Sequence, residues 1–413
     1  MEEWLIRRME ELCEITSSKR IYASDYVPEG VPFYRGKEIS EKYHGKSAIT
    51  TELFIRRSQF EKLRDKFGAP AEGDLLLTSI GALLGLPYVV RNNEEFYFKD
   101  GNLLWFRHFR NLDSRFLYYW MLSPSGKAQL AKSRIGSAQP AFTINLLKQM
   151  QIHLPPVSMQ RRVCQALEAY DDLIENNQRR IQILEGMARR LYREWFVHFR
   201  FPGHENHPRI PSPLGEIPQG WEAVPFTDIS DVLSGGTPKT DIPDYWNGDI
   251  PFFTPRDAPA GFYVSDCDKH VTELGVSKCA SQLYPPDTVF ITARGTVGKV
   301  ALPSVPMAMN QSCYALRGKV GVSQRFLFLM TLQQVDYLRT NTGGATFSTI
   351  VVDTFKRMVV VKPEREVIAK FTSLVGGMFD EARTLHQQTI NLRATRDLLL
   401  PRLLSGQIKL EAN

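Results

Sequence analysis

The chain has 413 residues, enough for two or three domains that each bury a core of their own. Its 43% hydrophobic and 23% charged residues are typical of a soluble protein, and a net charge of +6 permits a nucleic-acid partner without requiring one. The five cysteines lack any Cys-x-x-Cys pair, which favours a reducing cytoplasm over a disulfide framework. Neither a signal peptide nor a membrane segment is predicted, because the first residues are charged and the longest uncharged run, 75–90, contains glycine and proline.

Residues 1–155 are expected to form a first globular unit. A helix is predicted over 113–132, where apolar residues recur at helical spacing. A polar loop, a short helix and a strand follow, and the proline pair at 155–156 ends that strand. Short strands bounded by turn residues are predicted at 31–34, 75–78 and 87–90.

Residues 156–200 are predicted to form one long helix. Apolar positions recur alternately four and three residues apart, which is the seam of a coiled coil. A helix with such a stripe needs a partner to bury it. The seam positions are Val163, Leu167, Tyr170, Ile174, Asn177, Ile181, Leu184, Ala188, Leu191 and Trp195.

Residues 201–220 are expected to be a linker, because they are rich in proline, glycine and histidine. From 221 to 363 the pattern of the first half then starts again. The matches are Trp4 with Trp221, 31–34 with 250–253, 73–77 with 286–290, Gly85 with Gly298, 142–143 with 347–348, and 148–150 with 356–358.

A second long helix is predicted over 364–405, followed by a tail, 406–413. Its seam repeats the spacing of the first, and each helix follows a globular stretch, so the sequence predicts an α+β chain made by duplication. The second seam consists of Phe371, Val375, Met378, Ala382, Leu385, Thr389, Leu392, Arg396, Leu399 and Leu403.

No residue pattern for catalysis is found. The stretch 293–299 ends like a phosphate-binding loop, but Ala293 replaces the required glycine and Val300 the hydroxyl residue that binds Mg²⁺. A tight turn between strands explains it better, and neither a dinucleotide fingerprint nor a nucleophile elbow occurs elsewhere. Two histidine or cysteine groups lack zinc spacing, so no metal or cofactor is expected on this chain: His198, His204 and His207, and Cys267, His270 and Cys279.

Binding is the remaining interpretation, because loops at matched places contain basic, aromatic, hydroxyl and amide side chains. Lysine and arginine neutralise DNA phosphates, while arginine, glutamine, serine and threonine can recognise base edges. Each residue alone is better explained by an ordinary polar surface, but the matched set favours DNA contact. The candidates are Lys19, Arg20, Tyr34, Arg35, Lys37, Thr78, Ser79, Ser137 and Gln139, then Lys239, Thr254, Arg256, Thr292, Arg294 and Thr346.

The second half of the first long helix is rich in arginine. These side chains are either a solvated coiled-coil flank or a docking face for a partner or for phosphates. The candidates for partner binding are Arg179, Arg180, Arg189, Arg190 and Arg193.

Five motifs together make the chain resemble a specificity subunit of a type I restriction-modification system. Residues 342–346 depart from the family pattern, because they lack the glutamine-proline pair found at 139–140. The motifs are GSAQPAFTINLLKQMQIHLPP (136–156), WFVHFRFPG (195–203), LGEIPQGW (214–221), SGGTPKT (234–240) and LRATRDLLLPRLLSGQI (392–408).

The resemblance implies two similar, mixed α/β target-recognition domains, separated by the two long helices packed as an antiparallel coiled coil with pseudo-twofold symmetry. Each domain would recognise one half of a split double-stranded DNA target, and the chain itself would be non-catalytic. Methyltransferase (modification) subunits would bring S-adenosylmethionine and methylate adenine. Restriction subunits would bring ATP and Mg²⁺ for translocation and cleavage.

Two alternatives belong to other functional classes. A coiled-coil scaffold whose globular parts bind proteins would show no salt-dependent retention on DNA. A stand-alone enzyme would show turnover by the purified chain, although no catalytic residue pattern supports it.

Overall fold

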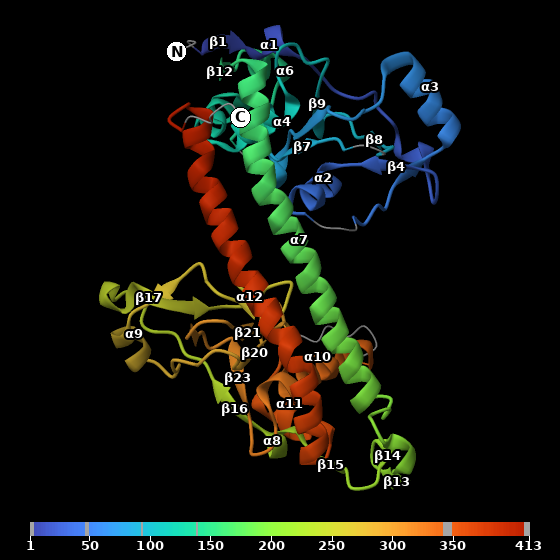
Figure 1. Cartoon of the computed structure of the whole chain (residues 1–413), viewed down its shortest axis with the longest axis vertical. Coiled ribbons are helices and arrows are strands. Elements are labelled where there is room, and N and C mark those ends of the chain that lie inside the picture. The colour runs from blue at the N-terminus through green and yellow to red at the C-terminus, as the bar shows by residue number, and fades with distance from the viewer. Residues whose placement is uncertain (1–3, 46–48, 92–93, 138, 342–348, 409–413) are drawn as a thin grey trace. The chain divides into compact units, whose positions relative to one another are not determined.

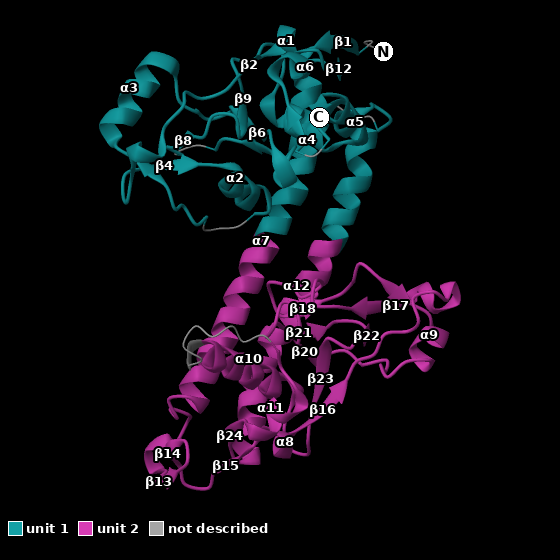
Figure 2. Cartoon of the chain, turned by 180° about the vertical axis from the view of Figure 1, so that it is seen from behind, with its two compact units in different colours: residues 1–175, 391–413 teal, residues 176–390 magenta. Residues whose placement is uncertain are grey.

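The computed structural model describes residues 4–45, 49–91, 94–137, 139–341 and 349–408. The chain forms two compact units (Figure 2). Unit 1 consists of Met1–Glu175 with Asn391–Asn413, and unit 2 is Asn176–Ile390. None of the helices in the described part of the chain is both long and apolar enough to cross a bilayer.

Unit 1 is built on two four-stranded sheets, ordered β2-β9-β6-β7 and β3-β5-β4-β8, with the pairs β1-β12 and β10-β11 beside them. Its strands are β1 (Leu5–Arg8), β2 (Glu14–Thr16), β3 (Tyr26–Val27), β4 (Val31–Tyr34), β5 (Phe54–Ile55), β6 (Leu75–Thr78), β7 (Pro87–Val89), β8 (Tyr97–Phe98), β9 (Leu103–Arg107), β10 (Arg134–Ile135), β11 (Ala141–Phe142) and β12 (Gln151–Leu154). Its own helices are α1 (Met9–Leu12), α2 (Gly36–Tyr43), α3 (Arg57–Phe67), α4 (Ser114–Leu122), α5 (Pro124–Lys132) and α6 (Ile144–Lys148).

Unit 2 has a five-stranded sheet, β16-β23-β20-β21-β18, a three-stranded sheet, β19-β17-β22, and the pairs β15-β24 and β13-β14. Its strands are β13 (Arg209–Ser212), β14 (Gly215–Pro218), β15 (Glu222–Pro225), β16 (Ser230–Ser234), β17 (Trp246–Phe253), β18 (Tyr263–Val264), β19 (His270–Val271), β20 (Val289–Thr292), β21 (Val300–Pro303), β22 (Ala308–Met309), β23 (Cys313–Gly318) and β24 (Val359–Lys362). Its own helices are α8 (Phe226–Ile229), α9 (Glu273–Ser277), α10 (Gln324–Asn341) and α11 (Val352–Arg357).

The duplication predicted from the sequence is confirmed by strand pairing. The order β2-β9-β6-β7 in unit 1 recurs as β16-β23-β20-β21 in unit 2. In both units a parallel pair also forms at equivalent places, β4 with β8 and β17 with β22. The two units therefore share a four-strand order and one parallel strand pair.

The register of the repeat differs from the sequence match by one residue around β6 and β20. Gly73 and Asp287 both have a positive φ, and their N–H groups donate to Val90 and Pro303 at 3.0 and 2.9 Å. Gly73 is thus the counterpart of Asp287, whereas the sequence match had paired the identical residues Asp74 and Asp287. The match was wrong because it followed side-chain identity, while the turn requires a left-handed backbone that Gly and Asp both adopt.

A second correction concerns the segment before α6 and α11. The N–H of Phe142 donates to Ser79 at 3.0 Å, and the N–H of Ile350 donates to Ala293 at 2.9 Å. Ile350, rather than Phe347, is therefore the counterpart of Phe142. The stretch 347–348, which the sequence match had paired with 142–143, lies outside the described residues.

The two long helices are α7 (Val157–Phe196) and α12 (Arg365–Leu404), each of 40 residues (Figure 1). They pack antiparallel, because the α12 partner falls in number as the α7 residue rises: Asp171 pairs with Arg396, Arg180 with Glu381, and Trp195 with Phe371. All predicted seam positions on both helices are buried or half-buried. The coiled-coil prediction is confirmed.

The segment 201–220 contains more structure than a linker. It holds one turn of 3-10 helix, His204–Asn206, and the hairpin β13-β14. Phe201 and Ile217 are buried, and the Phe201 ring stacks on Trp221 with centroids 5.0 Å apart. The apolar residues of this segment thus join the core of unit 2.

Glu185 on α7 is a buried carboxylate within unit 2. Its Oε1 accepts a hydrogen bond from the Phe262 N–H at 2.7 Å, and Arg189 is the charged neighbour that favours its ionised form. Desolvation nevertheless outweighs both and raises the pKa of Glu185 from 4.5 to about 7. The carboxylate therefore takes up a proton near neutral pH in the folded state.

Replacing Glu185 by glutamine is expected to change how stability depends on pH. Because the pKa is higher in the folded state, the wild-type chain loses stability as pH rises from about 4.5 to 7, by at most about 3 kcal/mol. Glutamine keeps an oxygen for the Phe262 N–H but does not titrate. The stability of the variant relative to the wild type should therefore increase as pH rises over this range. Urea titrations at pH 5 and pH 8 measure the difference. A difference in stability that is the same at both pH values would contradict it.

Candidate nucleic-acid interface

In unit 2, loops from four parts of the chain meet at one edge of the sheets. Three backbone hydrogen bonds hold them together: Gly236 donates to Met309 at 3.1 Å, Asn310 to Phe253 at 2.9 Å, and Ala293 to Ser312 at 2.7 Å. We call this surface the loop edge of unit 2. It comprises residues 235–239 after β16, 254–257 after β17, 293–299 after β20 and 310–312 between β22 and β23.

Three of the candidate DNA contacts are exposed cations on this loop edge: Lys239, Arg256 and Arg294. The loops of Arg256 and Arg294 adjoin, since a Cβ on Gly295 would lie 3.9 Å from Pro255. Within the described ranges no carboxylate forms an ion pair with any of the three. Uncompensated positive charge at a loop surface is suited to phosphate contact.

Unit 1 has an equivalent loop edge, formed by residues 17–20, 35–38, 79–86 and 99–102. The Ser18 hydroxyl donates to Phe98 at 2.6 Å, Lys99 N–H to Tyr34 at 2.9 Å, and Ser79 N–H to Asn102 at 2.9 Å. The last two bonds repeat those made by Asn310 and Ala293 in unit 2. The same loop arrangement is therefore built twice.

The cations of the unit 1 loop edge differ because most have acidic partners. Arg20 pairs with Asp100 at 3.1 Å, Arg35 pairs with Glu38 and Glu52, and Lys37 pairs with Glu52. These bonds keep the pKa of the Glu52 carboxylate below its ordinary value. Their charge is thus partly neutralised within the chain.

Five candidate contacts make packing contacts or hydrogen bonds inside the fold. Tyr34 is buried and stacks on Phe96 with centroids 4.3 Å apart, and burial raises the pKa of its hydroxyl to about 12. The Thr254 hydroxyl donates to Asp257 at 2.6 Å within its own turn. The other three are buried hydroxyl residues at the turns after β6 and β20: Thr78, Ser79 and Thr292.

These turns explain why the buried hydroxyls resemble a binding motif in the sequence. The Thr78 hydroxyl accepts the Leu86 N–H at 2.8 Å, and the Thr292 hydroxyl accepts the Lys299 N–H at 2.9 Å. Thr78 therefore corresponds to Thr292, whereas the sequence match had placed Ser79 there. The stretch 293–299 is a strand-to-strand turn of this kind, as its missing glycine and hydroxyl residue predict.

Three candidates in the loops before α6 and α11 have different outcomes. Ser137 and Gln139 are exposed. Their loop lies beside the loop edge of unit 1, because the Gly81 N–H donates to the Pro140 carbonyl at 3.0 Å. Thr346 lies outside the described residues.

The five candidate arginines of α7 are all exposed, and for two of them the contacts inside unit 2 are resolved. Arg180 pairs with Glu381 of α12, and the Arg189 guanidinium lies 5.0 Å from the ring centroid of Phe262. Arg190 and Arg193 are exposed to solvent. The candidate arginines thus include side chains that flank the coiled coil and side chains whose charge is accessible to a partner.

The sequence analysis missed a hollow of about 300 Å³ in unit 1, next to Lys19. Its lining brings together residues 16–19, the end of α3 and strands β8 and β9. The basic members missed are Lys66 and Arg107, and the aromatic ones are Phe67, Tyr97 and Trp105. The only local signal was a phenylalanine next to a lysine in RDKFG at 64–68, which is too common a pattern to single out.

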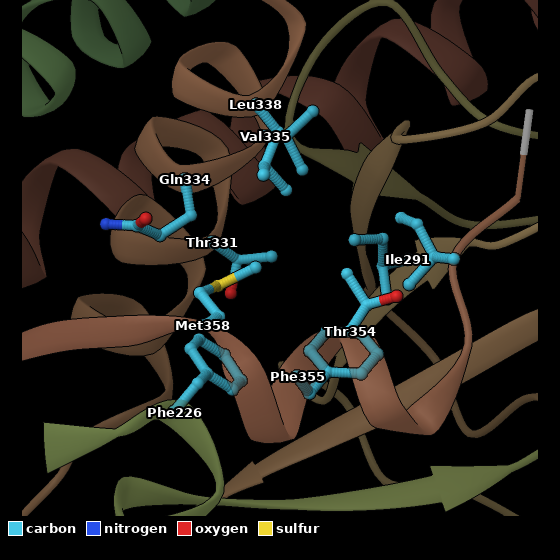
Figure 3. A pocket seen from close by; sticks show the side chains of 10 residues that line it. Phe226, Ile291, Thr331, Gln334, Val335, Leu338, Thr354, Phe355 and Met358 are labelled. Atoms are coloured by element: carbon cyan, nitrogen blue, oxygen red, sulfur yellow. The ribbon is translucent and has the colours of Figure 1, made fainter. Parts of the chain in front are cut away.

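Another pocket lies in unit 2 between β20, α10 and α11, where Figure 3 shows Phe226, Val335 and Phe355 around it. Its volume is about 10 Å³ and its walls are apolar. Such a gap holds at most one water molecule, so it is not a ligand site. Among the described residues, no group of three histidine, cysteine, aspartate or glutamate side chains gathers as metal ligands would.

This chain is similar to a known protein family over most of its length. The family model described as "Type I restriction modification DNA specificity domain" matches residues 1–185 and again 218–385. The MjaIX specificity subunit of a Methanocaldococcus jannaschii type I restriction enzyme is 32% identical over 172 residues, which are 41% of this chain and 40% of that one. The HindI specificity subunit of a Haemophilus influenzae type I restriction enzyme is 24% identical over 339 residues, 68% of this chain and 73% of that one.

A solved structure shares the fold over nearly the whole length. The S subunit of a type I restriction-modification system from M. genitalium matches with a TM-score of 0.60, covering 97% of this chain and 96% of that one at 14% identity. The two family matches together include both loop edges and most of both long helices. The chain therefore belongs to the family of type I restriction-modification DNA specificity proteins.

Proposed function

We propose that this chain is the DNA-recognition subunit of a type I restriction-modification complex, and that each unit recognises one half of a split target. The observation that carries this proposal is the repeated loop edge. Both units hold loops at the strand ends with the same backbone hydrogen bonds, yet present different exposed side chains. Two like frameworks with unlike side chains are what two different half-sites require.

The exposed loop-edge residues have the chemistry for this role. Arg256 and Arg294 in unit 2 can bind guanine edges in pairs of hydrogen bonds or hold phosphates. In unit 1, Gln139 can bind adenine in the same way, while Lys19 is suited to phosphate. The ion-paired Arg20, Arg35 and Lys37 would contact DNA only after exchanging their carboxylate partners for phosphates.

The long helices supply the spacing between half-sites in this proposal. An unbroken helix of 40 residues is stiff and about 60 Å long, and its seam is shared with the second helix. The accessible arginines Arg190 and Arg193 are proposed to dock modification subunits. Methylation with S-adenosylmethionine, and cleavage driven by ATP with Mg²⁺, are proposed to reside on those modification and restriction subunits.

Exchange of residues 1–150 for the corresponding part of another family member tests the proposal. Co-production with the cognate methyltransferase, followed by genome-wide mapping of methylated adenines, is expected to reveal a split motif. The exchange should alter one half of that motif and leave the other half unchanged, because each unit has its own core and its own loop edge. The matched control is the wild-type chain with the same methyltransferase. Alteration of both halves would show that the units do not recognise DNA independently.

A further inference from the structure

The hollow of unit 1 is positively charged without a compensating acid in its lining. Lys19, Lys66 and Arg107 line it, together with serine, threonine and aromatic residues. The lysine ammonium groups lie 4.8 and 5.3 Å from the ring centroid of Phe67, and in the described part of the chain neither forms an ion pair. Both lysines are therefore held by cation–π attraction and remain able to bind an anion.

The far wall of the hollow is rigid. The Arg107 guanidinium lies 4.3 Å from the Trp105 ring centroid, donates to the Phe67 carbonyl at 3.1 Å and pairs with Glu14 at 2.8 Å. Its Nε–H is buried and has no hydrogen-bond partner among the described residues. The Ser17 hydroxyl, also in the lining, donates to Leu103 at 3.1 Å and is thereby held in place. A rigid site loses little entropy when it binds.

The residues that frame this hollow differ in the described part of unit 2. By strand register Trp105 corresponds to Ala315, because they pair with the equivalent residues Leu76 and Phe290. Helix α3 has 11 residues, whereas α9, which stands at the same place in the chain order of unit 2, has five. A Cβ on Gly236 would lie 2.5 Å from the Ala280 nitrogen, so the loop after β16 is packed closely there.

We propose that the hollow lined by Lys19, Lys66 and Arg107 binds a backbone phosphate of the DNA duplex, as a subsite that unit 1 has and unit 2 lacks. This inference rests on the proposed function and adds an asymmetry to it. The hollow then gives unit 1 a salt-dependent contribution to affinity that does not depend on the DNA sequence. This contribution offsets the charge that Arg20, Arg35 and Lys37 lose to their acidic partners. A duplex of any sequence can serve as the probe, since phosphate contacts do not distinguish bases.

The test is the double substitution Lys19→Gln and Lys66→Gln in the full chain, with two unrelated DNA duplexes measured by fluorescence anisotropy. The slope of log affinity against log salt should become shallower by about 1 to 2 with both duplexes. The affinity advantage of the wild type should accordingly shrink by about tenfold between about 50 and 200 mM salt. Both side chains are exposed or at the rim, and thermal unfolding confirms that the variant is folded.

Two further variants make the result specific. Lys127→Gln with Lys132→Gln removes the same charge from α5, which Figure 2 shows on the opposite side of unit 1 from α3, and should leave the slope within about 0.5 of wild type. The double substitution Lys19→Arg with Lys66→Arg keeps both charges and should retain the wild-type slope. An unchanged slope in the glutamine variant, or an equal loss in the α5 control, would overturn the phosphate subsite. A wild-type chain without salt-dependent DNA binding would instead overturn the proposed function.

Discussion

Replacing Phe371 by alanine is expected to destabilise unit 2 by about 3–5 kcal/mol, the usual cost of removing a buried phenyl ring. Phe371 is fully buried on α12, and its ring lies 4.9 Å from Phe196, 5.6 Å from Trp195 and 6.4 Å from Phe326. These residues come from both long helices and from α10. One cavity would therefore loosen the attachment of both helices to the core of unit 2.

Urea denaturation followed by tryptophan fluorescence measures the Phe371 effect. The matched control is Leu374→Ala on the same helix, because Leu374 is 54% exposed and its loss should cost less than about 1 kcal/mol. Equal effects of the two substitutions would mean that the aromatic cluster does not hold the helices to unit 2.

Inserting one heptad into each long helix is expected to lengthen the gap between the two half-sites by about three base pairs. Seven residues add about 10.5 Å of helix, and a base pair adds about 3.4 Å of DNA. The insertions belong between residues 175 and 176 and between 390 and 391, where unit 1 passes into unit 2 on both helices. A whole heptad keeps the seam in phase, with a rotation of only about 20°.

Genome-wide mapping of methylated adenines measures the gap between half-sites in the chain with the heptad insertions. The cross-helix pairs Asp171–Arg396 and Arg180–Glu381 lie on either side of the insertions, so both should survive. A heptad added to α7 alone shifts one seam against the other and should abolish methylation. An unchanged gap with both insertions, or altered half-site sequences, would refute the role of the helices as a spacer.

The sequence located the loops that bear the candidate residues, but not the contacts that each side chain makes. The loops that bear the candidates do meet at one edge in each unit, because they follow strands that pair as the repeat predicts. Which side chains are available there was not predictable. Arg35 is bound by Glu52, and Arg107 by Glu14, and these partners lie 17 and 93 residues away along the chain.

The sequence by itself determined the duplication and the two helical seams, because both are periodic patterns that local spacing expresses. Tertiary structure alone decided the register of the repeat at Asp287, where a left-handed backbone made aspartate equivalent to Gly73. It also decided that Thr78 and Thr292 close turns and that Lys19, Lys66 and Arg107 share one hollow. The physical reason is that exposure and ion pairing depend on which distant segments meet, and no local pattern contains that information.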